Sequence, residues 1–413
     1  SAYRVTMVEE PPSELFDKFY SLSRQGAYGE LIRYLRKHED EDVRYGAAGV
    51  LAESVDGFAE QITPRTRKAL VDAVLNDPSD AVRATVVKTL LAIDESIADN
   101  IVTRLEMSPE STPTETPYPL ILTKWHDRQW PELRYLAVVG FERVGSSTTT
   151  EKLRTTIQRE TDLRVIRRAI EASGPVGDET FVTPIKNYLR IDEENTYQSA
   201  DAEQIHRTKQ AAVEALTTIG TEGAYEALLT ASRESDTDLK ACVISEIGRF
   251  ESEETIDLIV DELDNDDDDA VRQEAAEGLI TAFTESDFEE GHTVRQQALE
   301  TIGDDVDAAV SDEFASIVDD SPHKPEQRNA AWLLGQLETA TEDTVESLLA
   351  ALQHEDAYLR IIAAAGLTTL DPALVDQKLA GFIESVDEGS PAHDLASMIQ
   401  SRLQDGPEKA IWG

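Results

Sequence analysis

Apolar residues recur with a helical period along most of the chain. The segments EDVRYGAAGVL (41–51), DAVRATVVKTL (80–90) and DAVRQEAAEGL (269–279) each carry an arginine, small or apolar residues three and four places later, and leucine at the seventh place. These positions fall on one face of an α-helix. The same pattern returns in PELRYLAVVGF (131–141), TDLKACVISEI (237–247), HTVRQQALETI (292–302) and AYLRIIAAAGL (357–367). We therefore expect a chain of repeated helices.

Three weaker copies keep the apolar face but differ from the others at or near the basic position. They are DLRVIRRAIEASG (162–174), RTKQAAVEAL (207–216) and EQRNAAWLLG (326–335). The basic or equivalent position, which we call the anchor, recurs every 31 to 33 residues through Lys209, Lys240 and Arg272, and again through Arg295, Gln327 and Arg360. A period near thirty residues is typical of a two-helix unit.

A second amphipathic helix is expected upstream of several anchors, at YGELIRYLRKHE (28–39), RKALVDAVLND (67–77), IDLIVDELDND (256–266) and VESLLAALQHE (345–355). An acidic or polar turn separates the two helices of each unit. The run from Asp266 to Asp269 occupies the turn position that EDED (39–42) and DPSD (77–80) hold elsewhere. Aspartate at a helix start can cap free backbone N–H groups, so the run is interpreted as a capping turn. It lacks the glycine and distal glutamate of a calcium-binding loop.

The pattern of an acidic turn followed by D-x-V-R-x-x-A-A-x-x-L resembles HEAT-type repeats, in particular the short class named after phycobilisome lyases. The resemblance covers about Tyr28 to Pro372. It implies an all-α fold, a HEAT-like alpha-alpha superhelix or solenoid of about nine or ten two-helix repeats. Neither the ankyrin signature nor the tetratricopeptide tryptophan and tyrosine pattern is found in the sequence.

The expected organisation has three parts. Residues 1–27 form an extended segment and a capping helix, residues 28–387 the repeat solenoid, and residues 388–413 a capping helix and tail. The stretches 108–119 and 191–203 interrupt the repeats and are expected to be surface loops. The short spacing around 284–292 favours a joint between two arms of the solenoid. The closing KAIWG (409–413) is either a docking peptide or a segment that folds back on the last repeat.

The charge of the chain indicates the solvent conditions in which the protein works. The chain has 82 acidic and 38 basic residues, a formal net charge of −44, and only 12 of the bases are lysines. Because acid occurs in nearly every segment, the composition favours adaptation to a salt-accumulating cytoplasm, where molar salt reduces the Debye length to about 3 Å. The alternative is an acidic mimic that binds basic proteins. No segment resembles a signal peptide or a membrane span, and the single cysteine, Cys242, has apolar neighbours typical of a packed thiol.

The sequence lacks the motifs of common catalytic, metal and phosphate sites. Deoxyhypusine hydroxylases are HEAT-type enzymes with iron-binding His-Glu pairs, but His38-Glu39 and His354-Glu355 fall at turns here, and Gln273 occupies the matching helical position. No histidine or cysteine constellation supports a phycobilin lyase. We therefore predict no catalytic residue, cofactor or metal site. Direct nucleic-acid binding is not expected either, because no basic stripe is visible.

The resemblance implies that the second helix of each unit lines the concave side. We define the second-helix row as the first and fifth places after each anchor. Its aromatic and apolar members gather at the two ends of the chain, and the row is less acidic than the whole chain. Trp130 lies outside the row, at an otherwise acidic or polar turn position, whereas Trp125 matches a core position of the leading helices. The predicted partner-binding residues are Tyr45, Lys88, Trp130, Tyr135, Arg328 and Trp332.

These features favour a non-catalytic scaffold or adaptor that holds a protein or peptide along the concave face. The resemblance to archaeal HEAT-like proteins implies roles such as linking a signalling system to a motility apparatus, or attending a large assembly. One alternative is a lyase-like or metal-dependent enzyme, or an accessory subunit, with a ligand site in the groove. The other is an acidic mimic that binds basic proteins.

Overall fold

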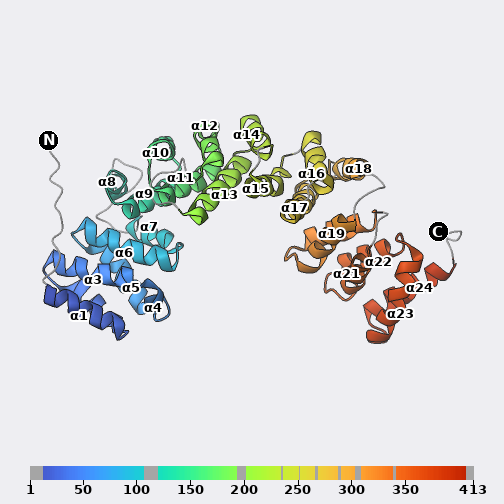
Figure 1. Cartoon of the computed structure of the whole chain (residues 1–413), viewed down its shortest axis with the longest axis horizontal. Coiled ribbons are helices and arrows are strands. Elements are labelled where there is room, and N and C mark those ends of the chain that lie inside the picture. The colour runs from blue at the N-terminus through green and yellow to red at the C-terminus, as the bar shows by residue number, and fades with distance from the viewer. Residues whose placement is uncertain are drawn as a thin grey trace. The chain divides into compact units, whose positions relative to one another are not determined.

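A computed structural model shows a chain of helices that divides into two compact units, Ser1–Ile219 and Gly220–Gly413 (Figure 1). The structure describes residues 13–106, 120–192, 201–233, 236–250, 252–265, 268–286, 290–302, 308–337 and 341–405. Within these ranges all regular elements are helical, which confirms the all-α prediction, and no helix is both long and apolar enough to cross a bilayer. The expected extended segment, the 108–119 loop and KAIWG lie outside the described residues.

The first unit consists of α1 (Ser13–Arg24), α2 (Tyr28–Lys37), α3 (Glu41–Glu53), α4 (Val55–Ala59), α5 (Pro64–Asn76), α6 (Asp80–Ile93), α7 (Ile97–Glu106), α8 (Leu120–His126), α9 (Pro131–Val144), α10 (Ser147–Arg159), α11 (Leu163–Val176), α12 (Val182–Ile185) and α13 (Ala202–Ile219). The second helices of its repeats stack in chain order, α3 on α6, α6 on α9, α9 on α11 and α11 on α13. In Figure 1, α9, α11 and α13 form one layer, and α8, α10 and α12 form a second layer along one side of it.

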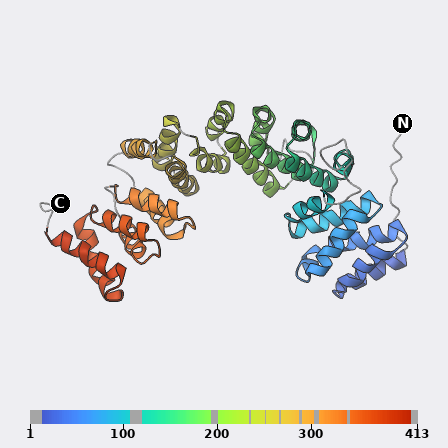
Figure 2. The same ribbon diagram turned by 180° about the vertical axis from the view of Figure 1, so that it is seen from behind.

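The second unit consists of α14 (Glu222–Ser232), α15 (Thr237–Ile247), α16 (Glu253–Asn265), α17 (Asp269–Glu285), α18 (Glu290–Ile302), α19 (Ala308–Asp320), α20 (Lys324–Leu334), α21 (Glu342–Ala351), α22 (Ala357–Leu367), α23 (Pro372–Ser385) and α24 (Pro391–Asp405). Figure 2 shows these helices from behind. Here α15 packs on α17, α17 on α20 and α20 on α22. The last contact is close, because a Cβ on Gly335 would lie 2.6 Å from the Cα of Gly366.

Helix α18 is an exception to the pairing. Its sequence copies the second helix of a repeat, yet it packs on the first helix α16 and on α17, and the next regular pair is α19 with α20. The stack of second helices therefore passes from α17 to α20 and leaves α18 outside it. The predicted joint at 284–292 lies inside the second unit, includes residues that the structure does not describe, and stays a prediction.

Helix starts follow the capping chemistry that the turns predict. Asp40 accepts a hydrogen bond from the backbone N–H of Asp42, Asp268 from that of Ala270, and Asp356 from that of Tyr358. An N-cap carboxylate satisfies a donor that the helix itself leaves unpaired. The acidic turns are thus part of the helix architecture, as predicted for Asp268, while Asp266 and Asp267 lie outside the described residues.

The core forms between the helix layers of each unit. The small pair that follows an anchor is buried, as in Ala47 and Ala48, which are 0% and 1% exposed. Trp125, predicted as core, is 1% exposed. In α11 the small pair is replaced by Arg167 and Arg168, whose charges are matched by glutamates on α9, α11 and the segment after α6.

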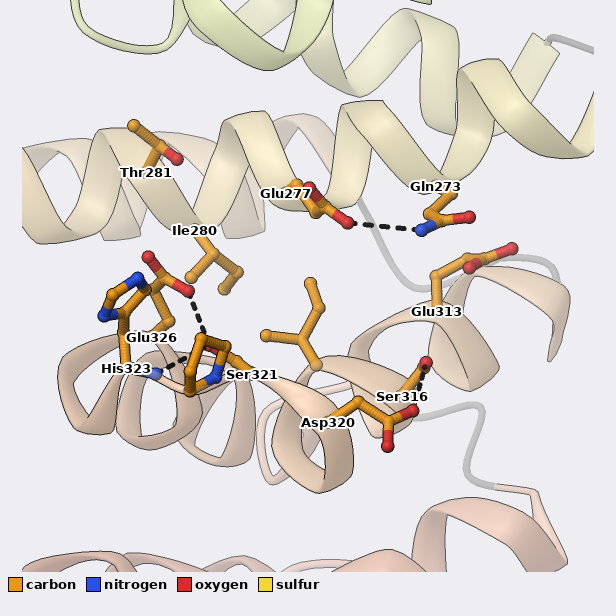
Figure 3. Close-up of a pocket in the computed structure, with 12 residues that line it drawn as sticks. Gln273, Glu277, Ile280, Thr281, Glu313, Ser316, Asp320, Ser321, His323 and Glu326 are labelled. Atoms are coloured by element: carbon orange, nitrogen blue, oxygen red, sulfur yellow. Dashed lines mark hydrogen bonds between the residues drawn. The ribbon is translucent and has the colours of Figure 1, made fainter. Parts of the chain in front are cut away.

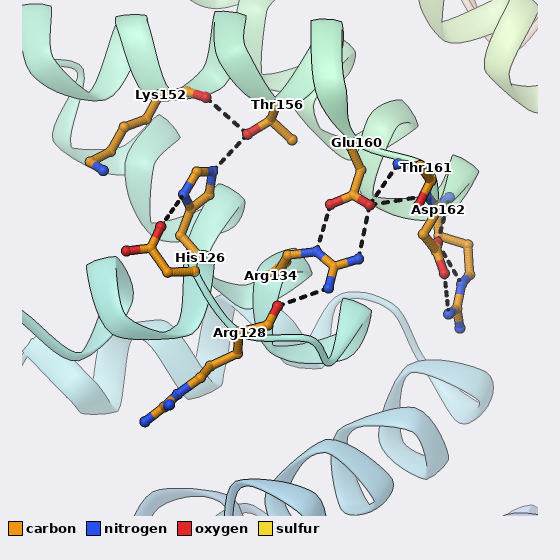
Figure 4. Close-up of polar contacts among 10 residues, drawn as sticks. His126, Arg128, Arg134, Lys152, Thr156, Glu160, Thr161 and Asp162 are labelled. Carbon is orange, nitrogen blue, oxygen red and sulfur yellow. Dashed lines mark hydrogen bonds and ion pairs between the residues drawn. The ribbon is translucent and has the colours of Figure 1, made fainter. Parts of the chain in front are cut away.

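The anchor arginine joins neighbouring repeats. Arg44 Nε lies 2.8 Å from Asp77 Oδ2 in the following turn, while Nη1 donates to the carbonyl oxygens of His38 and Glu39 at the end of its own first helix. Arg134 repeats this arrangement with the carboxylate of Glu160 and the carbonyl oxygen of Arg128 (Figure 4). The side chains of Arg44 and Asp77 are only 9% and 5% exposed.

The two units differ sharply in charge. Ser1–Ile219 contains 27 basic and 36 acidic residues, a formal charge of −9, whereas Gly220–Gly413 contains 11 basic and 46 acidic residues, a charge of −35. Acid does occur along the whole chain, as the sequence indicated, but most of its excess belongs to the second unit. Any electrostatic selection of partners therefore differs between the units.

The Arg44 contact gives a stability prediction. Arg44→Ala should destabilise the first unit by about 3 kcal/mol, because it leaves the buried Asp77 carboxylate without its partner. Urea unfolding at fixed KCl would measure the change. The double variant with Asp77→Ala should lose less than the sum of the two single variants. Arg33→Ala, which removes an exposed ion pair with Glu30, should change stability by less than about 1 kcal/mol. Strict additivity of the Arg44 and Asp77 effects would contradict the coupling.

His126 gives a pH-dependence prediction. Its Nε2 lies 2.9 Å from Thr156 Oγ1, and burial, helped by nearby Lys152, lowers the pKa of the imidazole below its ordinary value of 6.5 (Figure 4). The unfolded chain then binds a proton more readily, so stability should fall as pH drops below 6.5 and level off below the folded-state pKa. His126→Gln should flatten this part of the urea-unfolding profile. An equal slope in wild type and His126→Gln, with the exposed His206→Gln as control, would contradict the assignment.

Candidate functional site

The predicted partner residues occupy four different second helices or their starts. Lys88 is exposed on α6, Tyr45 is half-buried on α3, and Arg328 and Trp332 are half-buried on α20. Trp130 is half-buried at the N-cap position of α9, where it makes no side-chain capping hydrogen bond. None of these five residues is fully buried, and their binding role stays a prediction.

Tyr135 differs from the expectation of an exposed row residue, because it is only 5% exposed. It lies on the first turns of α9, among Glu95, Glu171 and the arginines of α11, which surround its phenol. Burial, together with the negative charges of the two glutamates, raises the pKa of Tyr135 to about 12. The sequence pattern placed Tyr135 on the correct helix face but could not reveal the neighbouring repeat that covers it.

Lys88 and Tyr135 nevertheless meet at one cavity of the first unit, with a volume of about 230 Å³. We call it the α6–α9–α11 cavity, and it is lined by Lys88, Leu91, Ala92, Glu95, Pro131, Glu132, Tyr135, Arg164 and Val165. Three successive second helices thus contribute to one concavity. Two residues predicted from separate repeats are brought together by the stacking of those repeats.

The acids of this cavity are already paired. Both carboxylate oxygens of Glu95 lie 2.9 Å from Arg167 Nη2, and Glu132 lies 3.5 Å from Arg164 Nη2. Arg164 also binds Asp162 at 2.8 Å. Lys88, in contrast, has no ion-pair partner among the residues that the structure describes. The cavity therefore contains paired carboxylates, of which Glu132 shares its arginine with Asp162, beside one ammonium without an ion-pair partner.

The second unit contains an arginine–aromatic cluster, defined as Phe283, Arg295, Arg328, Trp332 and Tyr358. The Arg295 guanidinium lies 5.8 Å from the ring centre of Phe283 and 5.7 Å from that of Trp332, and the two rings meet edge to face. Arg328 lies 5.0 Å from the ring of Tyr358 and binds Asp356 at 2.6 Å. Four helices, α17, α18, α20 and α22, are joined by this cluster.

The cluster borders open space. A concavity of about 680 Å³ is lined by Phe283, Thr284, Ser286, His292, Arg295, Pro325, Arg328 and Asn329. Tyr358 is 68% exposed, and Ile361 on the next turn of α22 is 60% exposed. Burial lowers the pKa of Arg295, whose Nη2 donates to Asn329 Oδ1 at 2.8 Å. Sequence analysis included Ile361 in the row but missed Phe283, Arg295 and Tyr358 as partner candidates, since these lie off the row positions.

A second concavity of this unit, of about 470 Å³, is acidic (Figure 3). Its walls come from α17 on one side and from α19 and the start of α20 on the other. Glu277 accepts a hydrogen bond from Gln273, Glu326 accepts one from Ser321, and Glu313 pairs with Arg272. Burial raises the pKa of Glu313 despite that arginine. The carboxylates are thus held by local partners, around an apolar floor that includes Ile280 and Ile317.

The two histidine–glutamate pairs have turn functions. The Nδ1 atom of His38 accepts the N–H of Asp40, and that of His354 accepts the N–H of Asp356. Among the described residues, no three or more histidine, cysteine, aspartate or glutamate side chains form a group that could hold a metal ion. Cys242 is half-buried on α15. These contacts account for the His-Glu pairs through local structure.

The helix-pair architecture and the anchor contacts define a HEAT-like solenoid. The family model of HEAT repeats matches residues 29–111 and 197–280, and that of the PBS lyase HEAT-like repeat matches residues 326–354. The chain therefore contains HEAT repeats, with a repeat of the PBS-lyase class in its second unit.

One curated relative is the HEAT repeat-containing taxis protein of Halobacterium salinarum, which is 26% identical over 118 residues. The match covers 28% of this chain and 29% of the relative. Among solved structures, the CpcE–CpcF complex of phycocyanin lyase from Nostoc sp. PCC7120 is 16% identical, with 72% of this chain and 97% of that chain covered and a TM-score of 0.34. Kap121p is 10% identical, with 95% and 49% covered and a TM-score of 0.37. These two likenesses carry no argument about function.

Proposed function

We propose that this protein is a non-catalytic scaffold or adaptor that binds a protein or peptide partner on the faces of its second helices. The arginine–aromatic cluster of the second unit is the observation that carries the proposal. HEAT repeats generally mediate protein interactions. In this chain the cluster distinguishes the surface formed by α17, α18, α20 and α22 chemically from the other repeats. Its two arginines and three aromatic side chains belong to residue types that dominate binding energy at protein interfaces.

The cluster has the physical properties of a pre-organised interface. Arg295 lies beside two aromatic rings that meet edge to face, so its side chain is already restricted and loses little conformational entropy when a partner binds. Tyr358 and Ile361 add exposed apolar surface on the adjoining helix α22. Apolar and stacked contacts also persist at high ionic strength, where exposed ion pairs are screened.

The cellular setting is part of the same proposal. The acidic composition fits a protein of a high-salt, archaeal cytoplasm, and the taxis relative favours a role in signalling or within a larger assembly. The acidic-mimic alternative would use the second unit, with its charge of −35, and would require affinity to collapse as salt rises. An enzyme or accessory subunit with a ligand site in a groove is the remaining alternative.

The test is affinity capture from a lysate of the source organism at about 2 M KCl, where electrostatic attraction is screened. The double variant Tyr358→Ser/Ile361→Ser removes exposed apolar surface without opening the core. It should reduce recovery of a defined partner by about tenfold or more, as expected when interface anchors are lost. Quantitative mass spectrometry of wild-type and variant eluates would measure the loss.

Met398→Ser is the matched control, because Met398 is also exposed, at 49%, but lies on α24. Recovery with this variant should equal that of wild type. Equal partner recovery with Tyr358→Ser/Ile361→Ser would disprove the proposed face. A partner retained at low salt and lost at 2 M KCl would support the acidic mimic instead, and an eluate with a chromophore or metal but no protein would support the ligand-binding enzyme.

A further inference from the structure

The α6–α9–α11 cavity has hydrogen-bonding capacity that the described part of the chain does not use. It lies in the first unit, whereas the arginine–aromatic cluster lies in the second, so either site can bind without the other. Its chemistry comes from the hydroxyl of a largely buried tyrosine and from an ammonium without an ion-pair partner.

The hydroxyl belongs to Tyr135. The side chain is 95% buried, yet its oxygen has no hydrogen-bond partner among the described residues and is not among the atoms sealed from solvent. Tyr135 also lines the cavity, so a ligand bound there lies next to this side chain. Because solvent reaches this oxygen, water can bind it in the free protein, and an acceptor on a ligand would take the place of that water.

The ammonium belongs to Lys88. The two acids of the wall, Glu95 and Glu132, are bound by Arg167 and Arg164, so neither is available to neutralise it. Of the two cations that line the cavity, Arg164 is shared by Glu132 and Asp162, whereas Lys88 has no ion pair among the described residues. Lys88 is therefore the cation of the wall that can pair with a ligand anion.

The two helix starts at the cavity add few free donors. Pro131 on the first turn of α9 has no N–H, and the N–H groups of Leu133 and Arg134 donate to the carbonyl oxygen of Trp130. At the start of α11 the N–H groups of Arg164 and Val165 are bound by Asp162. Hydrogen bonds to a ligand are therefore expected from Lys88 and Tyr135.

We propose that the α6–α9–α11 cavity binds a carboxylate attached to a short apolar body. The Lys88 ammonium and the Tyr135 hydroxyl donate to the carboxylate beside the start of α9, and the apolar body rests on Leu91, Ala92 and Val165. The volume of about 230 Å³ suits one group of amino-acid size. A free organic acid and the C-terminal residue of a peptide both present this chemistry.

Calorimetric titration of the purified full chain at fixed KCl tests the site. The probes are 4-methylpentanoate, as the free acid, and the peptide acetyl-Gly-Gly-Leu with a free C-terminal carboxylate. The matching neutral probes are 4-methylpentanamide and the same peptide as its C-terminal amide. At least one carboxylate should bind with one-to-one stoichiometry, and its amide should bind at least about tenfold more weakly, because a charged acceptor makes the stronger hydrogen bond.

Two variants locate the binding. Tyr135→Phe removes only the unpartnered hydroxyl and keeps the buried ring, and Lys88→Gln removes only the charge. Each should weaken carboxylate binding by about tenfold. Lys68→Gln is the control, because Lys68 is exposed on α5, outside the cavity, and this variant should bind like wild type. Circular dichroism and thermal unfolding of each variant separate lost binding from lost folding.

Binding of the free acid alone would identify a small-molecule source, and tighter binding of the peptide would identify a partner's C-terminus. Both outcomes support the site. No binding of either carboxylate by the folded wild-type protein would overturn it. Equal affinity for acid and amide, or wild-type affinity in both Tyr135→Phe and Lys88→Gln, would overturn it as well. None of these results depends on partner capture by the second unit.

Discussion

The guanidinium of the anchor arginine fixes the position of a repeat's first helix relative to its second helix and to the next repeat. The regular stacking of the repeats depends on this contact. In the Arg44 unit, one side chain joins the carbonyl end of the first helix, the intervening turn and the acid of the following repeat. The carbonyl oxygens at that helix end have no partner within the helix, so the arginine satisfies them while it fixes the neighbouring turn. Arg134 and Glu160 repeat the contact farther along the first unit. Stacking and turn geometry are thus set by the same interaction.

Both candidate sites arise where that regular pattern is modified. In α11, Arg167 and Arg168 replace the small pair, and Arg167 pairs with Glu95 in the wall of the cavity while Arg168 pairs with Glu142 on α9. In the second unit, Gln327 takes the anchor place and binds the carbonyl oxygen of Val318, while the adjacent Arg328 is directed to Asp356 and Tyr358. Because Gln327 takes the anchor place, Arg328 is not needed for the anchor contact and lies at the surface. Functional specificity in a solenoid comes from such local departures, because the repeat itself specifies shape.

The difference in charge separates the two units chemically. The first unit, at −9, contains a cavity with an unmatched lysine, and the second, at −35, combines an acidic concavity with an arginine–aromatic cluster. A strongly acidic surface repels acidic partners at low salt and loses much of that effect when the charges are screened. The stacked arginines and exposed apolar groups then have the larger influence on which surface is bound.

The sequence by itself determined the positions of most described helices, the family of the repeat and the acidic helix caps. Periodicity and capping are local, so EDVRYGAAGVL was sufficient to place α3 and Asp268 to place the start of α17. Tertiary structure decided the burial of Tyr135, the packing of α18 and the contact of Arg295 with the rings of Phe283 and Trp332. These depend on how helices from different repeats are rotated and spaced against one another, which a pattern within one helix does not encode. The row predicted the helix face, and the neighbouring repeats determined which of its side chains remain available.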